Sequence, residues 1–345
     1  MHSSGHSTGD PERWQARLPP GRVVHPVPLD PTGMVGPTRN QARSRGWRRV
    51  GRNAYVPRDV EQTSAQRAVE IAASLPSGGA LTGWAALRLA GGGWFDGVAS
   101  DGVTQLPVPI VLPHSVRRTV PGAIVLRSTA PIAVVRRAGV SCTDPETAVL
   151  DQMFLTWNNR EKVVVMDMAA AAGLTSIGRV RARLAGDVRR RGTVALGQAL
   201  DLACEASASP RETHLGLTWQ LDAGFPTPLR NPDVLTLDGR FVGRPDLLDV
   251  EAGVAGEYDG AVHNLNARRR KDLARLDRFA AVGIEVFTIV AGDDLDTQVR
   301  RMRAARERAR WAPEAQRAWR VVGRCECHPI VAGSESSISG DGMEL

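Results

Sequence analysis

The sequence has few cysteines, little tyrosine and no long apolar run. Four cysteines among 345 residues are too few for a secreted disulfide scaffold. The longest apolar stretch, 163–174, is interrupted by Asp167 and is too short to cross a bilayer. Residues 1–14 contain no apolar segment of the signal-peptide kind. We therefore expect a cytoplasmic protein with no membrane partner.

Lysine is almost absent. Only Lys162 and Lys271 are lysines among 44 basic residues, which face 37 acidic ones and give a net charge of +7 and a pI of about 10.0. A strongly basic chain favours an anionic partner, and nucleic acid before others. The arginine bias is also typical of a GC-rich coding sequence. The positions of the charges therefore carry more weight than their number.

The composition supports a folded chain of several domains. Hydrophobic residues make up 42% and charged residues 23%, which excludes global disorder and allows buried cores. At about 150 residues per domain, the length predicts two to three domains. The turn-rich and charged segments predict a disordered tail over 1–26, a winged-helix-like unit over 27–60, a small α+β region over 61–150, a helical connector over 151–204, an α/β domain over 205–310 and a tail over 311–345.

A basic hairpin is predicted near the amino terminus. Two strand-like pieces, Trp47–Val50 and Ala54–Val56, flank the turn residues 51–53. A helix followed by a basic hairpin is typical of a winged helix-turn-helix, and an ordinary surface hairpin is the alternative. Under the first interpretation, four arginines of this unit bind DNA: Arg45, Arg48, Arg49 and Arg52.

The carboxyl-terminal third alternates helix and strand signals. Ser209-Pro210-Arg211-Glu212 is typical of a helix start, because Ser can cap the helix and Glu follows three residues later. Asp238-Gly239 between two strand-like runs indicates a hairpin. The order of the elements predicts a mixed sheet flanked by helices. These elements are a helix over 209–223, strands over 234–237 and 240–242 (the second extended by 246–248), a strand over 253–259, a helix over 266–282, a strand over 284–290 and a helix over 295–310.

Three carboxylates fall on the predicted strands. Glu257 and Asp259 are two residues apart, so their side chains share a face of the sheet. Asp246 precedes Glu257 by eleven residues, which lets adjacent strands bring the two side by side. Grouped carboxylates repel unless a cation lies between them, and hard oxygen ligands select Mg²⁺ or Mn²⁺. Such an ion can activate water at a phosphodiester, and His263 follows closely enough to act as base or acid.

Each of these residues also has a purely structural interpretation. Glu212 could serve only to close a capping box, Asp246 could cap or form an ion pair, and His263 could be an ordinary turn or core histidine. The pair Glu257 and Asp259 is harder to explain in this way. Two carboxylates on one face of an apolar strand cost stability unless they are paired or bind a metal.

The predicted helix over 266–282 has a basic face and an apolar face. We expect the apolar face to point toward the core. The basic face either binds DNA phosphates or is simply solvated. The basic residues are Arg268, Lys271, Arg275 and Arg278, and the apolar residues are Leu273, Leu276 and Ala280.

Together, these motifs resemble the very-short-patch-repair (Vsr-like) endonucleases, a branch of the PD-(D/E)xK nuclease fold. The resemblance covers about residues 205–305. Residues 35–150 are similar, more loosely, to AbiEi-type antitoxins through 46–56 and 82–87. The motifs that carry the nuclease resemblance are Arg244-Pro245-Asp246, Glu257-Tyr258-Asp259-Gly260, His263, Arg270-Lys271-Asp272 and Gly283-Ile284-Glu285-Val286.

The resemblance implies a role for each matching residue. Glu212 matches the acidic residue on the first core helix, and Asp246 and Glu257 match the metal ligands. Asp259 stands where the general fold has a lysine, as is usual in this branch, and His263 matches the branch's histidine. Without the lysine, water activation would fall to the metal, to His263 or to a base elsewhere in the site.

The leading hypothesis is a Mg²⁺- or Mn²⁺-dependent DNA endonuclease that is targeted by its amino-terminal DNA-binding region. The alternatives are a non-catalytic DNA-binding antitoxin or repressor, with a cognate toxin or regulatory partner, and an RNA-directed enzyme. The set of Asp246, Glu257 and Asp259 favours the first. The segment Cys325-Glu326-Cys327-His328 lacks a second ligand pair at zinc-finger spacing, so we expect no zinc site there.

Overall fold

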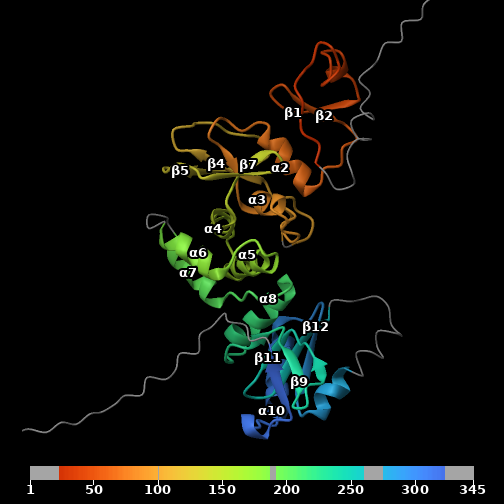
Figure 1. Ribbon diagram of the computed structural model, residues 1–345, viewed down its shortest axis with the longest axis vertical. Coiled ribbons are helices and arrows are strands. Elements are labelled where there is room, and N and C mark those ends of the chain that lie inside the picture. The colour runs from red at the N-terminus through yellow and green to blue at the C-terminus, as the bar shows by residue number, and fades with distance from the viewer. Residues whose placement is uncertain (1–22, 100, 187–191, 260–274, 323–345) are drawn as a thin grey trace, which may run out of the picture.

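A computed structural model describes residues 23–99, 101–186, 192–259 and 275–322. The elements follow one another along the long axis: an N-terminal hairpin, a five-stranded sheet, a helical layer and a C-terminal α/β domain (Figure 1). The chain is a mixed α/β protein, as the sequence predicts. Within the described ranges, no helix is both long and apolar enough to cross a membrane.

The basic hairpin forms where the sequence predicts it. Strand β1 (Trp47–Gly51) pairs antiparallel with β2 (Ala54–Pro57), and Asn53 adopts the left-handed conformation (φ 54°) in the tight turn between them. The helical element before the hairpin is a single 3-10 turn, η1 (Gln41–Arg43). Residues 27–46 contain no α-helix, because prolines and glycines interrupt the chain between 26 and 37. The winged-helix assignment therefore stays a prediction.

A five-stranded sheet follows the hairpin. Its strand order is β5-β4-β3-β7-β6, with parallel pairs β4–β5 and β3–β7 and antiparallel pairs β3–β4 and β6–β7. Two helices accompany it, α2 (Ser64–Ala72) and α3 (Gly83–Leu89). The strands are β3 (Ala80–Leu81), β4 (Val108–Pro113), β5 (Ala123–Ser128), β6 (Val134–Arg137) and β7 (Val140–Thr143).

A layer of helices packs beneath this sheet. One hydrophobic core, which includes Leu87, Ile110, Leu150 and Met166, spans both the sheet region and the helices. The predicted region over 61–150 and the predicted connector over 151–204 therefore share a single core. The helices are α4 (Pro145–Leu155), α5 (Asn159–Ala171), α6 (Ile177–Ala185) and α7 (Thr193–Leu202).

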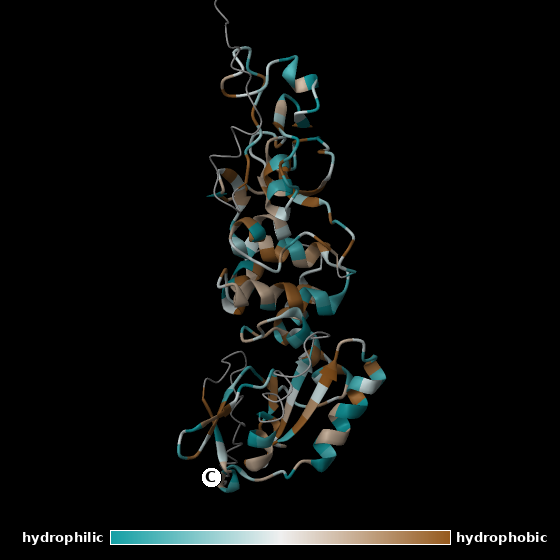
Figure 2. Ribbon diagram, turned by 90° about the vertical axis from the view of Figure 1, so that its right-hand side faces the viewer, coloured by the Kyte–Doolittle hydropathy of each residue, from teal (hydrophilic) through white to brown (hydrophobic). Residues whose placement is uncertain are grey.

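The C-terminal domain is built on a four-stranded mixed sheet in the order β13-β12-β11-β8, in which β12 and β13 are parallel and the other pairs antiparallel. Helix α8 (Pro210–Leu217) lies between the helical layer and this sheet, and continues through a π-helical turn, η2 (Thr218–Asp222) (Figure 1). Helix α10 (Leu295–Arg308) packs on the sheet, and Figure 2 shows hydrophilic residues along much of its length. The strands are β8 (Leu229–Arg230), β11 (Leu247–Asp249), β12 (Val254–Asp259) and β13 (Glu285–Val290).

A second, three-stranded sheet corrects two predictions. The hairpin strands β9 (Asp233–Thr236) and β10 (Phe241–Gly243) do not extend into β11. They form a separate sheet with β14 (Trp319–Val322) in the order β10-β9-β14, and a 3-10 turn, η3 (Glu314–Gln316), precedes β14. The predicted tail therefore contributes a strand, because the Trp319 side chain is buried in the core of this domain.

Candidate functional site

The register of two adjacent strands brings two of the predicted carboxylates together. Leu247 of β11 lies opposite Gly256 of β12. Asp246 immediately precedes β11, and Glu257 follows Gly256 on β12, so a continuation of this register would bring Asp246 next to Glu257. The backbone N–H of Tyr258 donates a 2.8 Å hydrogen bond to Oδ2 of Asp246, which fixes Asp246 against β12.

Opposing influences act on the charge of Asp246. Burial raises the pKa of Asp246 above its ordinary value, and the nearby negative charge of Glu212 raises it further. The Tyr258 N–H and the positive charges of Arg275 and Arg230 act in the opposite direction. Asp246 therefore lies in an environment where an additional cation would stabilise its charged form.

Glu212 does close a capping box, and it also lies beside the site. The Ser209 hydroxyl donates a 2.9 Å hydrogen bond to Glu212 Oε1 and accepts one from the Glu212 N–H. The other oxygen, Oε2, accepts hydrogen bonds from the Ala208 N–H (2.7 Å) and from Nδ2 of Asn231 (2.6 Å). Both carboxylate oxygens of Glu212 are thus already engaged in holding the start of α8 against the sheet.

Arg275, which was predicted on the basic face of its helix, lies beside the site carboxylates. Its guanidinium is 2.7 Å from Oε1 of Glu257 and donates a 2.6 Å hydrogen bond to the carbonyl of Arg244. Residues 275–281 are helical, with Phe279 fully buried. Arg275 and Phe279, four residues apart, share the face toward the sheet.

The apolar face of this helix is therefore not the predicted one. Leu276 is exposed to 37% and Ala280 is also exposed, while Leu273 lies outside the described residues. Arg278 is exposed but anchored, since its Nε donates a 2.9 Å hydrogen bond to the carbonyl of Val242. The bulky Phe279 side chain has more apolar area to bury than Leu276 or Ala280, and it sets the rotation of the helix.

The remaining predicted site residues contribute less in the structure. Asp259 ends β12 and is exposed. Three others, His263, Arg268 and Lys271, lie outside the described residues. Across the described ranges, no group of three or more His, Cys, Asp or Glu is arranged to hold a metal ion. The described site is thus the pair Asp246 and Glu257 rather than a three-carboxylate cluster.

A buried arginine that the sequence did not predict, Arg230, lies close enough to Glu212 and Asp246 to interact with their charges. Arg230 of β8 is 3% exposed, and its Nη1 donates a 2.7 Å hydrogen bond to the carbonyl of Glu212. It passes so close to Gly216 of α8 that a Cβ at Gly216 would overlap the guanidinium. Burial lowers the pKa of Arg230, while the negative charges of Asp167, Glu212 and Asp246 and the Cys204 thiol oppose that change. No local sequence signal distinguishes this arginine from the many others in the chain.

Asp167 of α5 links the helical layer to the C-terminal domain. Its carboxylate accepts hydrogen bonds from the Cys204 N–H (2.7 Å) and the Thr213 hydroxyl (2.8 Å). Burial raises the pKa of Asp167 from 3.8 to about 6, despite these hydrogen bonds and the positive charge of Arg230. The folded protein therefore holds a proton on this group at pH values where the unfolded chain has lost it.

This difference predicts a pH dependence of stability. Because the pKa is higher in the folded state, the contribution of Asp167 is fully present below about pH 4 and is lost as the pH rises through about 6. A pKa of about 6 against 3.8 corresponds to about 3 kcal/mol of unfolding free energy. Urea unfolding of wild type and Asp167→Asn between about pH 4 and pH 7 measures it. The stability of wild type relative to the variant should fall by most of that amount, and a constant difference would contradict the assignment.

The arginines of the N-terminal hairpin divide into two groups. Arg48 forms a two-pronged ion pair with Glu70 of α2, at 2.6 and 2.8 Å, so it joins the hairpin to the helix. Arg45, Arg49 and Arg52 are exposed. The DNA-binding role of all four arginines stays a prediction, in which Arg48 would first have to leave Glu70.

A hollow of about 360 Å³ lies beside the hairpin turn. Arg49 and Arg52 line it from the hairpin, and Arg118 lines it from the loop between β4 and β5. Three arginines around one hollow make a cationic surface that suits phosphate groups. Arg118 was not predicted, because it is far from the hairpin in sequence.

Comparison with known proteins finds no relative of this chain. No protein-family model, no curated protein and no solved structure matches the chain.

Proposed function

We propose that this protein is a metal-dependent endonuclease of the Vsr-like kind, which hydrolyses phosphodiester bonds in DNA and is directed to DNA by its N-terminal hairpin. The observation that carries the proposal is the position of Asp246: it immediately precedes β11 and is hydrogen-bonded to β12 at Tyr258, the residue after Glu257. Glu212 lies close enough to raise the pKa of Asp246. Such convergence of carboxylates beside cationic groups is typical of phosphoryl-transfer sites.

The pair Asp246 and Glu257 fits a small hard cation. Mg²⁺ and Mn²⁺ prefer oxygen ligands, and Mg²⁺ is commonly held by one or two carboxylates together with substrate phosphates. A set of two carboxylates is therefore sufficient. When bound there, the ion would activate water and stabilise negative charge on the phosphate.

The chain's own cations have separate tasks in this proposal. Arg230 neutralises the buried side of the site and anchors α8 through the carbonyl of Glu212. Arg275 balances the charge of Glu257, and once released from that carboxylate it is placed to bind a DNA phosphate.

The ion pair between Arg275 and Glu257 also favours a second candidate function. A carboxylate that is already neutralised by an arginine does not need a metal ion. On this alternative, the C-terminal domain is a non-catalytic platform in a DNA-binding regulator of the AbiEi-antitoxin type.

Plasmid nicking separates the two candidates. Wild-type protein is incubated with supercoiled DNA in Mg²⁺ or in EDTA, beside Asp246→Ala. The endonuclease proposal predicts nicked DNA with wild type in Mg²⁺ and none in EDTA or with the variant. Plasmid that is bound by wild type but stays supercoiled in Mg²⁺ would favour the regulator.

DNA binding through the cationic hollow has its own test. Replacing Arg49 and Arg52 by glutamine removes two candidate phosphate-binding groups, so DNA affinity should fall most at low salt, and the slope of log affinity against log salt should become shallower by about 0.9 for each phosphate that is no longer neutralised. Arg300→Gln/Arg303→Gln on α10 is the charge-matched control, because it removes the same charge from a distant surface. Fluorescence anisotropy on duplex DNA measures both. An equal decrease for the two double variants would argue against a specific role for the hollow.

A further inference from the structure

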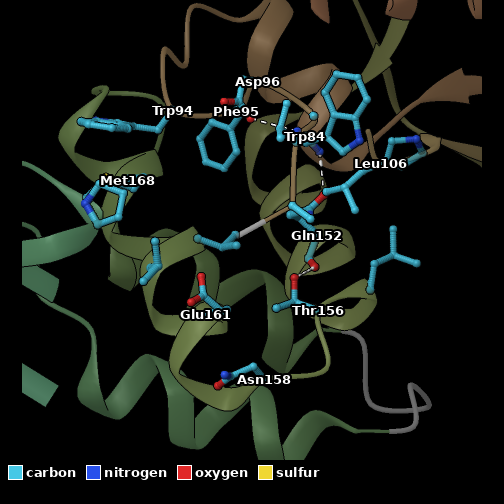
Figure 3. A pocket seen from close by; sticks show the side chains of 18 of the residues that line it. Trp84, Trp94, Phe95, Asp96, Leu106, Gln152, Thr156, Asn158, Glu161 and Met168 are labelled. Atoms are coloured by element: carbon cyan, nitrogen blue, oxygen red, sulfur yellow. Dashed lines mark hydrogen bonds between the residues drawn. The ribbon is translucent and has the colours of Figure 1, made fainter. Parts of the chain in front are cut away.

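A pocket of about 660 Å³ beside α5 is lined by several aromatic side chains. Its inner wall includes Trp84 and Phe95, which are 3% and 6% exposed, together with Val164 and Met168. Trp94 and Phe95 lie on one side, and Glu161 of α5 lies on the opposite side (Figure 3). This volume falls within the range of roughly 300–1,000 Å³ that is usual for pockets that bind small ligands.

Two tryptophans at the mouth of the pocket are unusually exposed. Trp157, between α4 and α5, is 98% exposed, and Trp94 is 53% exposed. Large aromatic side chains in water are costly, and a cluster of them beside a concave surface marks a binding site. Flat indole rings suit the stacking of another flat ring.

Charged groups also line the pocket. Arg211 and His214 of α8 line the pocket, and the His214 Nε2 is 3.1 Å from Oε1 of Glu161. Arg211 is exposed, and its guanidinium lies 5.7 Å from the Tyr258 ring centroid. The pocket therefore offers stacking surfaces, a hydrogen-bond acceptor and a solvent-accessible cation, which is the combination that a base with an attached phosphate requires.

We propose that this pocket binds an unpaired nucleotide, with the base stacked on the aromatic walls and the phosphate on Arg211. The site is separate from the carboxylate pair: Arg211 lines the pocket, whereas its neighbour Glu212 turns to the C-terminal sheet through Asn231. Nucleotide binding in this pocket does not require hydrolysis, so this proposal is independent of the proposed endonuclease function. A net charge of +7 assists the approach of such an anionic ligand.

The test measures the binding of a short, labelled single-stranded oligonucleotide to the full chain in EDTA, by fluorescence anisotropy. Trp157→Ala and Trp94→Ala should each weaken binding by at least about fivefold, because each removes a stacking surface. The weakening should be the same at low and high salt, whereas the effect of Arg211→Gln should shrink as salt increases. Trp157→Phe should restore most of the affinity, and Phe241→Ala, an exposed aromatic elsewhere, should have no effect.

Competition distinguishes the sources of the ligand. If an unlabelled mononucleotide displaces the oligonucleotide, the pocket takes free nucleotides. If a longer single strand alone competes, it takes a base within a strand. The rim variants remain suitable because exposed side chains do not support the core, and circular dichroism melting confirms their folding. Unchanged oligonucleotide affinity in Trp157→Ala and Trp94→Ala would overturn the proposal.

Discussion

Replacing Asp246 with Asn is expected to reduce Mg²⁺-dependent cleavage of DNA by orders of magnitude. The substitution keeps the shape of the side chain but removes one of the two negative charges that would attract a divalent cation. DNA binding should be unchanged or slightly stronger, because a carboxylate repels phosphate. Initial rates of plasmid cleavage, with DNA affinity measured in EDTA, separate the two effects.

The stability of this variant distinguishes a catalytic from a structural role. Burial raises the pKa of Asp246, so its charged form is held at a cost and the neutral Asn should fold at least as well. Asp296→Asn, an exposed carboxylate in the first turn of α10, is the matched control and should retain full activity. A lower melting temperature for Asp246→Asn, with no cleavage by wild type, would indicate that Asp246 is purely structural.

Gly216→Ala should be the most destabilising small substitution in the C-terminal domain. A Cβ at Gly216 would overlap the guanidinium of Arg230, which is buried and bound to the Glu212 carbonyl. Moving a buried charge away from its partners, or distorting α8 around it, costs about 3 kcal/mol. Urea unfolding of the two proteins gives the difference in unfolding free energy.

Gly197→Ala supplies the control for this prediction. Gly197 lies inside α7, and a Cβ there would meet no atom within 4 Å. The same substitution should therefore stabilise the protein by about 0.5–1 kcal/mol, through helix propensity alone. Similar effects at Gly216 and Gly197 would mean that Arg230 does not occupy the described position.

Local chemistry made part of the fold predictable. The hairpin over 47–57 follows from a turn that tolerates a left-handed Asn53, and the start of α8 follows from Ser209 and Glu212. Partners distant in sequence decided the rest. Strands β10 and β11 are close in the chain but join different sheets, because β9 also pairs with Trp319–Val322, which lies far downstream in the sequence.

The candidate site shows the same division. The spacing of Asp246 and Glu257 predicted two adjacent strands, and β11 does pair antiparallel with β12, although β11 begins one residue after Asp246. The predicted buried face of the helix at 275–281 was wrong, because Phe279 buries more apolar area than the smaller residues from which that face was predicted. No sequence pattern predicted the buried position of Arg230. That position depends on the space left by the missing side chain of Gly216, which lies on a different element.

Titration of Mn²⁺ into metal-free protein by calorimetry tests the central claim most directly. Wild type should bind the ion through Asp246 and Glu257, and Asp246→Asn should bind it much more weakly, because half of the attracting charge is gone. The measurement needs neither a DNA sequence preference nor turnover. Identical titrations without metal binding for wild type and Asp246→Asn would contradict the assignment of this site to a metal-dependent nuclease.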